Sequence, residues 1–323
     1  MTAIISNPTD FNVEDLYVDL RPSTGYPLLL KCEGFNFAGS VKLKAATEMV
    51  EAKERDGELF PGATLIESSS GNMGVALSIV AASRGYRFIC VTDIRCTLAA
   101  RRLMEAFGSE VHVITEPDLE NGFLAARLSY VRQLCAANPG YLWLNQYAND
   151  GNWMGHYRTT GAEIAKAFPL LDLLFVGAGT TGTLMGCAHY FRANQPSVTI
   201  VAVDAVGSVT FGGSSGRRLI PGLGSGVRPG ILDMSCVDDV VHVSEAETVR
   251  MCHQLVRHGF LFGGSTGTVV SGALAWMKAN GVSDDVTAVA ISPDFGTNYL
   301  ETIYNDEWLA QSYGPQSLSD RST

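Results

Sequence analysis

The sequence lacks the features that mark several large classes of protein. Its longest apolar runs, at residues 170–171 and 173–176, are separated by Asp172, and none approaches the ~20 apolar residues of a membrane span. Lys and Arg number 23 against 33 Asp and Glu, and the net charge of −10 argues against general nucleic-acid binding, which needs a basic surface. Residues 1–10 hold no basic patch followed by an apolar block, so we expect no secretory signal.

Cysteine and histidine occur without the short spacings of metal or redox sites. The seven Cys include no C-x-x-C pair and the six His include no H-x-x-x-H pair, so we expect no metal site. Several Cys stand in apolar runs, such as Cys90 within residues 88–91, which is typical of buried thiols. Reduced thiols and the absence of a signal favour a cytoplasmic protein.

What the chain does contain is enough apolar material for a large core. It has 323 residues, of which 46% are hydrophobic and 17% charged, and this length predicts about two domains. Apolar segments alternate with amphipathic ones. We expect strands at residues 28–32, 64–68, 87–93, 110–115, 141–146, 173–178, 198–205, 240–243 and 286–292. We expect helices at residues 41–54, 73–84, 98–106, 120–136, 157–167, 183–193, 245–257 and 268–278.

This alternation predicts a three-layer α/β protein with mostly parallel sheets, because near-continuous Val/Ile/Leu strands need helices on both faces. The polar segment at residues 147–152 carries turn chemistry and marks the expected domain boundary. Residues 207–230 are rich in Gly and predict a long irregular loop.

Three Gly- and hydroxyl-rich turns each join a predicted strand to a helix. Gly177-Ala178-Gly179-Thr180-Thr181-Gly182-Thr183 offers backbone N–H groups, hydroxyls and a helix start, which together favour phosphate binding over an ordinary tight turn. It is not a P-loop, because no Lys follows the last Gly. In Ser68-Ser69-Ser70-Gly71-Asn72-Met73-Gly74, capping by Ser70 or Asn72 is the alternative to carboxylate binding. Gly263-Gly264-Ser265-Thr266-Gly267 is the third such turn.

Lys42 stands two residues after a candidate N-cap, Ser40, in the first turn of a predicted helix. The positive end of the helix dipole disfavours a charged amine there and so favours the neutral, nucleophilic form. A solvated surface lysine is the alternative interpretation.

These residues together resemble a known family. Asn36-x-x-x-Ser40-x-Lys42, Ser69-Ser70-Gly71-Asn72-Met73-Gly74, Gly179-Thr180-Thr181-Gly182-Thr183, Gly264-Ser265 and Pro293-Asp294 follow the order seen in the cysteine synthase and cystathionine β-synthase family of fold-type II pyridoxal-phosphate enzymes. The resemblance spans almost the whole chain and implies a two-domain, tryptophan synthase β-like architecture. It implies a smaller substrate-binding domain at 35–148, a larger cofactor-binding domain at 12–34 plus 149–310, and a tail at 311–323.

The resemblance also implies roles for individual residues. Lys42 would hold pyridoxal 5'-phosphate as an imine and shuttle the Cα proton, Asn72 would bind the ring oxygen of the cofactor, and Ser265 would face its pyridine nitrogen. The phosphate would lie on Gly179, Thr180, Thr181, Gly182 and Thr183. The substrate carboxylate would be held by Ser69, Ser70, Gly71 and Gln146. We expect Arg127 and Tyr147 to contact the substrate, and Arg217-Arg218 are further candidates.

Within the family, four stretches resemble a subgroup that makes a precursor of 2,3-diaminopropionate for siderophores or peptide natural products. They are residues 145–149, 202–211, 221–224 and 299–308. This likeness implies β-replacement with O-phospho-L-serine and L-glutamate as substrates, in a cytoplasmic homodimer that binds neither nucleic acid nor membrane.

The chain departs from the family pattern in places. Leu43-Lys44 replace the usual Asp-Arg, and Gly179 stands where the subgroup often has Ser. Lys44 therefore competes with Lys42 for the cofactor, although the Ser-x-Lys spacing favours Lys42. Within the family the alternative is a cysteine synthase that uses O-acetylserine, or O-phospho-L-serine, and sulfide. Outside it the alternatives are a nicotinamide-dependent dehydrogenase and an inactive binding protein.

Overall fold

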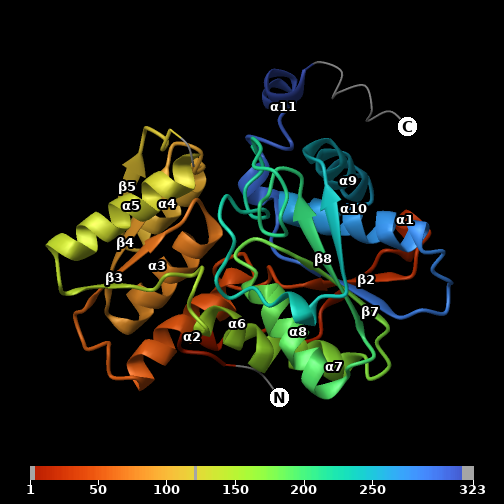
Figure 1. Cartoon of the computed structure of the whole chain (residues 1–323), viewed down its shortest axis with the longest axis horizontal. Helices are drawn as coiled ribbons and strands as arrows, with labels where there is room; N and C mark the ends of the chain where they lie inside the picture. The colour runs from red at the N-terminus through yellow and green to blue at the C-terminus, as the bar shows by residue number, and fades with distance from the viewer. Residues whose placement is uncertain (1–3, 120–121, 315–323) are drawn as a thin grey trace.

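The computed structural model describes residues 4–119 and 122–314, which form two sheets with helices around them (Figure 1). The larger sheet has the strand order β1-β2-β10-β7-β8-β9, and the smaller one β5-β4-β3-β6. In these parts of the chain β1 and β2 pair antiparallel, and the pairings between the other strands are parallel. The predicted α/β class with mostly parallel sheets is confirmed.

The strands and helices have the following bounds. The strands are β1 Tyr17–Asp19, β2 Leu28–Cys32, β3 Thr64–Ser68, β4 Arg87–Asp93, β5 Glu110–Ile114, β6 Tyr141–Trp143, β7 Leu173–Gly177, β8 Thr199–Ala205, β9 Asp239–Val243 and β10 Ala288–Ser292. The helices are α1 Arg21–Thr24, α2 Lys42–Arg55, α3 Asn72–Arg84, α4 Leu98–Ala106, α5 Gly122–Ala137, α6 Gly151–His156, α7 Ala162–Ala167, α8 Gly182–Asn194, α9 Glu245–Arg257, α10 Gly264–Ala279 and α11 Asp306–Tyr313. A π-helical segment, Tyr157–Gly161, joins α6 to α7, and the 3-10 turn η3 covers Met234–Cys236.

Each sheet is buried on both faces, which explains its uninterrupted apolar strands. In β7, Leu173 and Phe175 pack into the cluster that contains α9 and α10, whereas Leu174 and Val176 pack into the cluster that contains α7 and α8. The smaller sheet likewise lies between α2, α3 and α4 on one side and α5 on the other. Alternate side chains of a strand point to opposite faces, so both rows are apolar and the predicted three layers are present.

A few elements differ from the predictions. The predicted helix at 157–167 begins earlier, at Gly151, and passes through the π-helical segment. The edge strand β1 was not predicted, because its three residues carry too short a pattern. Within the predicted tail, residues 311–313 are the last residues of α11 and Gly314 caps it, and residues 315–323 lie outside the described residues. Glu120, the predicted start of the helix at 120–136, also lies outside them, and α5 begins at Gly122.

The helix starts at the candidate site are formed without the side-chain caps expected from the sequence. The residue before α2 is Val41 rather than Ser40, although the Ser40 hydroxyl still receives the Lys42 N–H at 3.4 Å. The residue before α3 is Gly71, so neither Ser70 nor Asn72 caps that helix, although the Ser69 hydroxyl accepts the Gly74 N–H in its first turn. The first-turn N–H groups that no side chain caps remain available for a ligand.

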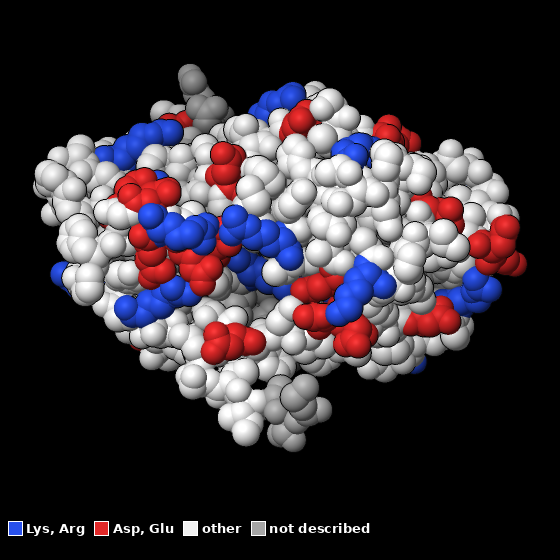
Figure 2. Space-filling model, turned by 90° about the horizontal axis from the view of Figure 1, so that it is seen from below, with Lys and Arg blue, Asp and Glu red and all other residues white. Residues whose placement is uncertain are grey.

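Thiols, helix lengths, the Gly-rich loop and surface charge can also be described for these parts of the chain. All seven thiols are free, and six of them are buried. None of the described helices has the length and apolar character needed to cross a bilayer. Residues 207–230 contain the predicted irregular loop. On the face shown in Figure 2, basic and acidic side chains are intermixed rather than gathered into a basic patch.

Candidate active site

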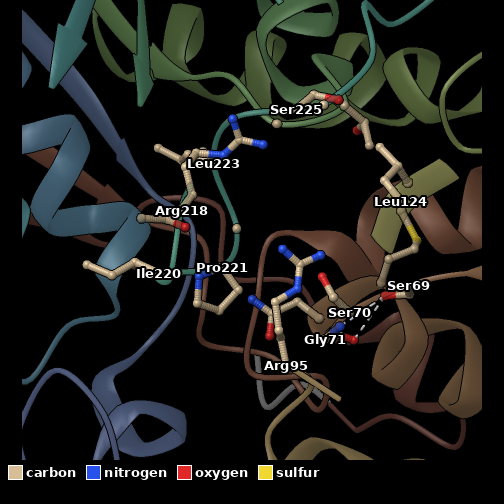
Figure 3. Close-up of a pocket in the computed structure, with 18 of the residues that line it drawn as sticks. Ser69, Ser70, Gly71, Arg95, Leu124, Arg218, Ile220, Pro221, Leu223 and Ser225 are labelled. Atoms are coloured by element: carbon tan, nitrogen blue, oxygen red, sulfur yellow. Dashed lines mark hydrogen bonds between the residues drawn. The ribbon is translucent and has the colours of Figure 1, made fainter. Parts of the chain in front are cut away.

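A cavity of about 510 Å³ lies where the carboxyl ends of strands from the two sheets meet. The turns after β3, β6 and β7 all contribute to its wall, as expected for open parallel sheets. Each of the predicted site residues lines it: Lys42, Ser69, Ser70, Gly71, Asn72, Arg127, Gln146, Tyr147, Gly179, Thr180, Thr181, Gly182, Thr183 and Ser265. Figure 3 shows the Ser69–Gly71 turn on one side and residues 218–225 on the other.

Lys42 is the first residue of α2 and points into this cavity. Burial lowers the pKa of its amine, and the nearby Asp294 carboxylate opposes this shift. The first turn of a helix adds positive potential, which also favours the neutral amine. The structure therefore favours the nucleophilic form of this lysine.

Lys44, the competing lysine, is directed elsewhere. Its Nζ lies 3.0 Å from Glu33 and 2.9 Å from Glu163, and Lys31 joins the same buried cluster at 2.9 Å from Glu163. Lys44 does not line the cavity. Lys42 and Lys44 are two residues apart on α2 and therefore point in different directions. Lys44 forms buried ion pairs, whereas Lys42 faces the cavity.

The turn after β7 carries an unusual conformation at Thr181. This residue has a left-handed backbone with φ of 66°, which is costly for a β-branched side chain, and its buried hydroxyl has no hydrogen-bond partner among the described residues. Thr181 precedes α8, so the hydroxyl lies at a helix N-terminus. A strained residue with an unsatisfied donor at a positive helix end is what an anion-binding turn requires.

The neighbouring residues of this turn are held from α6. Asn152 donates to the Thr180 hydroxyl at 3.0 Å, and His156 lies 3.2 Å from the Thr183 hydroxyl. Burial lowers the pKa of His156 well below its usual value, so its ring is neutral. A Cβ at Gly182 would overlap the Asn152 side chain, which explains the glycine. Sequence reasoning missed Asn152 and His156, because both are about 30 residues from the turn they support.

Asn72 is also held by a residue to which the sequence assigned no role. Its amide donates to Asp294 at 2.8 Å, and the Tyr299 hydroxyl donates to the same carboxylate oxygen at 2.6 Å. Burial raises the pKa of Asp294. An amide carries two N–H bonds, so one donor of Asn72 remains for a ligand while the other fixes the side chain.

Ser265 stands in the first turn of α10, against the loop at 221–224. Gly222 has φ of 109°, and a Cβ there would overlap the Ser265 hydroxyl. A Cβ at Gly179 would lie 2.6 Å from the carbonyl oxygen of Gly222. This close approach gives a physical reason for glycine at 179, where the resembling subgroup often has Ser.

The turn at Ser69 is internally bonded. The Ser69 hydroxyl accepts the N–H groups of Gly71 at 3.2 Å and Gly74 at 2.9 Å. Gln146 donates its side-chain amide to the Ser68 carbonyl at 2.8 Å. These bonds shape the N-terminus of α3 and leave Ser70, which is half-buried, on the cavity wall.

Cationic side chains dominate the cavity wall. Its described charged residues are Lys42, Arg95, Arg127, Arg218 and a single acid, Asp118. In Figure 3 the guanidinium groups of Arg95 and Arg218 extend into the open space. A locally positive cavity in a chain of net charge −10 is suited to anionic ligands.

Arg127 is the most buried of these cations, with 4% exposure. Its Nε lies 3.2 Å from Asp93, and its Nη1 has no hydrogen-bond partner in the described structure. Burial alone would raise the pKa of Asp93, but Arg95 and Arg127 hold it below its usual value. One carboxylate thus serves two guanidiniums, which leaves positive charge facing the cavity.

Burial raises the pKa of the Tyr147 phenol, which therefore stays protonated and can donate. A neutral donor beside Arg127 complements the cationic wall. Together with Lys42, the Thr181 turn and Asn72, the cavity offers an amine, a turn suited to an anion and an amide with a free N–H donor. These donors fit a phosphorylated aldehyde cofactor.

Comparisons with known proteins agree with this geometry. The family of pyridoxal-phosphate dependent enzymes matches residues 17–294. A relative from Ralstonia nicotianae named N-(2-amino-2-carboxyethyl)-L-glutamate synthase is 38% identical over 283 residues, which cover 87% of this chain and 83% of the relative.

Solved structures give the same answer. A variant of O-ureido-L-serine synthase with O-ureido-L-serine bound is 30% identical, with a TM-score of 0.87 over 96% of this chain and 98% of the other. A hydrogen sulfide-producing enzyme from Fusobacterium nucleatum is 29% identical, with a TM-score of 0.81 over 88% of this chain and 95% of the other. On the extent of these matches, the chain belongs to the family of pyridoxal-phosphate-dependent enzymes.

Proposed function

We propose that the chain catalyses a β-replacement in which the phosphate of O-phospho-L-serine is exchanged for the amine of L-glutamate. The Cβ–O bond breaks and inorganic phosphate leaves. The Cβ–N bond forms, the amine loses a proton, and the product is N-(2-amino-2-carboxyethyl)-L-glutamate. The Nη1 atom of Arg127, buried on the cavity wall without a hydrogen-bond partner among the described residues, is the observation that carries this choice of donor.

Bound pyridoxal phosphate supplies the electron sink for the reaction. The residues of the chain hold it and move protons around it. The 179–183 turn would hold its phosphate, and Asn72 its ring oxygen. Lys42, whose low pKa favours the free base, would attach it and take the Cα proton of the substrate. Ser265 would face the ring nitrogen; a hydroxyl does not enforce a charge there, which favours loss of a β-substituent over transamination.

The anionic groups of the donor would have two separate places. Its carboxylate would lie at the N-terminus of α3, against Ser69, Ser70, Gly71 and Gln146. Its phosphate would lie toward Arg127 and Tyr147. A guanidinium with a free Nη1 and a protonated phenol suit a phosphate dianion.

The charge of the wall also distinguishes this proposal from a cysteine synthase that uses O-acetylserine. The acetyl ester is uncharged until it leaves as acetate, and sulfide is a small anion, so neither substrate calls for three arginines around one cavity. A phosphate donor and a dicarboxylate acceptor do, because buried cations are stable only when anions compensate them.

The decisive experiment is mass spectrometry of products formed by the holoenzyme from O-phospho-L-serine with glutamate or with sulfide. We expect phosphate release to depend on glutamate and the product to contain both carbon skeletons. Sustained phosphate release with sulfide alone, giving cysteine, would reject the proposal in favour of the synthase.

A matched pair of variants on α5 tests the donor subsite. Arg127→Gln should raise the KM for O-phospho-L-serine by roughly 100-fold while cofactor absorbance persists, because a charge-assisted pair is lost. Arg132→Gln lies on the same helix with an exposed side chain outside the cavity and should change nothing. Equal kinetics of both variants would remove Arg127 from the site.

The remaining assignments rest on family likeness alone and are part of the same proposal. They are the homodimer, the cytoplasmic location, the supply of 2,3-diaminopropionate to a siderophore or peptide natural product, and the division into a substrate-binding domain at 35–148 and a cofactor-binding domain at 12–34 plus 149–310.

A further inference from the structure

A second group of reactive side chains lies outside the cavity. His189 stands on α8, Asp233 directly precedes η3, and Cys236 is the last residue of η3. One ligand atom from each of the three lies within 4.8 Å of the others. None of these residues lines the cavity, so the group is independent of the substrate assignment.

Two of the three distances between the donor atoms match those of metal ligands. Cys236 Sγ lies 3.4 Å from His189 Nδ1 and 3.6 Å from Asp233 Oδ2. In a tetrahedral zinc site, with Zn–S near 2.3 Å and Zn–N or Zn–O near 2.0–2.1 Å, neighbouring donors are roughly 3.5 Å apart. The donor atoms of His189 and Asp233 lie within 4.8 Å of each other, so an ion bound to Cys236 would reach both once these two side chains move together by up to about 1 Å.

The surroundings hold each donor in place. The second carboxylate oxygen of Asp233 accepts the Ser235 N–H at 2.9 Å and its hydroxyl at 2.7 Å, which leaves Oδ2 toward Cys236. The His189 ring packs on Trp153 at a centroid distance of 4.9 Å. The Asp233 N–H donates to Met185, one turn before His189, and so ties η3 to α8. Partners that orient the ligands in this way are a regular property of metal sites.

The three side chains differ in their exposure to solvent. Cys236 is 7% exposed, His189 is half-buried, and Asp233 is exposed. The thiol is thus screened from bulk solvent while the carboxylate side is open to water. Three protein donors and an open position accommodate an ion that takes water as its fourth ligand.

We propose that His189, Asp233 and Cys236 form a binding site for a thiophilic divalent cation such as Zn²⁺. Sulfur, imidazole and carboxylate together select Zn²⁺ over Mg²⁺ or Ca²⁺, which prefer oxygen donors. Binding displaces the Cys236 proton to solvent and forms one bond to each of the three side chains. This proposal departs from the expectation of no metal site, which rested on short sequence spacings; Cys236 is 47 residues from His189.

A metal ion at this position would act on the helix that follows the 179–183 turn. His189 lies seven residues after Gly182, roughly 10 Å along α8 from the phosphate-binding turn. An ion there would fix η3 against the helix that carries this turn.

Titration of the holoenzyme with Co²⁺ and with Zn²⁺ tests the proposal. Co²⁺ should bind with one equivalent per chain and produce a thiolate-to-cobalt charge-transfer band in the near ultraviolet. Zn²⁺ should displace it. Cys236→Ser should abolish the band, and His189→Gln should weaken Zn²⁺ binding by at least about 100-fold, since one of three protein ligands is lost.

Cys135→Ser is the matched control, because Cys135 is half-buried on α5 and outside the group. It should leave the band and the affinity unchanged. Absence of a charge-transfer band in the wild-type protein would overturn the proposal without recourse to any variant. A band that survives Cys236→Ser, or disappears with Cys135→Ser, would also overturn it.

Discussion

Thr181 combines two features that a folded chain ordinarily avoids. It is a β-branched residue with a left-handed backbone, and its buried hydroxyl has no partner among the described residues. Arg127 likewise buries a guanidinium nitrogen without a hydrogen bond. Features of this kind are typical of ligand-binding sites, and we expect changes that relieve the strain at Thr181 to stabilise the apoprotein while they weaken binding.

Thr181 allows that trade to be measured. Thr181→Gly should leave the apoprotein at least as stable as the wild type, with a gain of about 1 kcal/mol, because glycine tolerates the left-handed conformation. Thr181→Ala keeps the strain but loses the hydroxyl. Both should weaken binding of pyridoxal phosphate by roughly 10- to 100-fold. Urea unfolding and fluorescence titration of the apoprotein measure the two effects, and unchanged affinity in both variants would contradict the assignment.

Variants of Lys42 and Lys44 test two different properties, the covalent attachment of the cofactor and the stability of the fold. Lys42→Ala should bind cofactor without a covalent, borohydride-reducible attachment, which peptide mapping by mass spectrometry detects. Lys44→Ala should keep that attachment but lose about 3 kcal/mol of stability, because Glu33 and Glu163 lose a buried partner. A reducible attachment that persists in Lys42→Ala would transfer the role to another lysine.

Most of the predicted cavity residues were recognisable because they follow strands in Gly- and hydroxyl-rich turns, whereas Arg95 on the same wall carries no such pattern and was missed. The residues that support them were not recognisable. His156, Asn152 and Tyr299 carry no local pattern and act on residues of other elements. The His189 group was missed for the same reason. Contacts between distant segments leave no spacing in a single sequence, so only the fold brings them into view.

At the scale of elements, buried strands were the most predictable part of the chain. β2, β3 and β4 have their predicted bounds, because apolar side chains fill both faces of the sheet. The connection from α6 to α7 was predicted less well. Its start at Gly151 depends on close packing rather than on periodicity, since a Cβ at Gly151 would lie 2.9 Å from the backbone of Met49.

Helix α8 illustrates how packing between elements supports the site. A Cβ at Gly186 would overlap the backbone of Trp153 on α6, the helix that also supplies Asn152 and His156. Gly186→Ala should therefore cost at least about 2 kcal/mol of stability, because backbone cannot move aside as a side chain can. Gly140→Ala is the control, since no atom lies within 4 Å of its added Cβ. Thermal unfolding compares them, and equal melting temperatures would show that the helices can separate freely.

At the scale of the whole molecule, strands of the two sheets direct their carboxyl ends at one cavity, and that arrangement buries charge beneath it. Glu67, near the end of β3, is fully buried. It accepts the N–H groups of Ser68 at 2.7 Å and Gln146 at 3.0 Å, so it links a strand of the smaller sheet to the turn before α6. The buried Glu67 and the arginines that line the cavity are brought close together by the fold, and no sequence motif indicated this arrangement.

Glu67 gives the stability of the whole chain a characteristic pH dependence. Burial raises its pKa to about 7, against 4.5 ordinarily, although hydrogen bonds from Ser68, Gln146 and Trp143 and the charge of Arg127 oppose the shift. Between these values the folded chain holds more protons than the unfolded one. Stability from this group is therefore present at low pH and is lost as the pH rises toward 7, by about 3 kcal/mol. Glu67→Gln does not titrate, so the difference in unfolding free energy between wild-type and variant apoprotein should fall across this window. Urea unfolding at several pH values measures it; a difference that stays constant would show that Glu67 keeps an ordinary pKa in the folded chain.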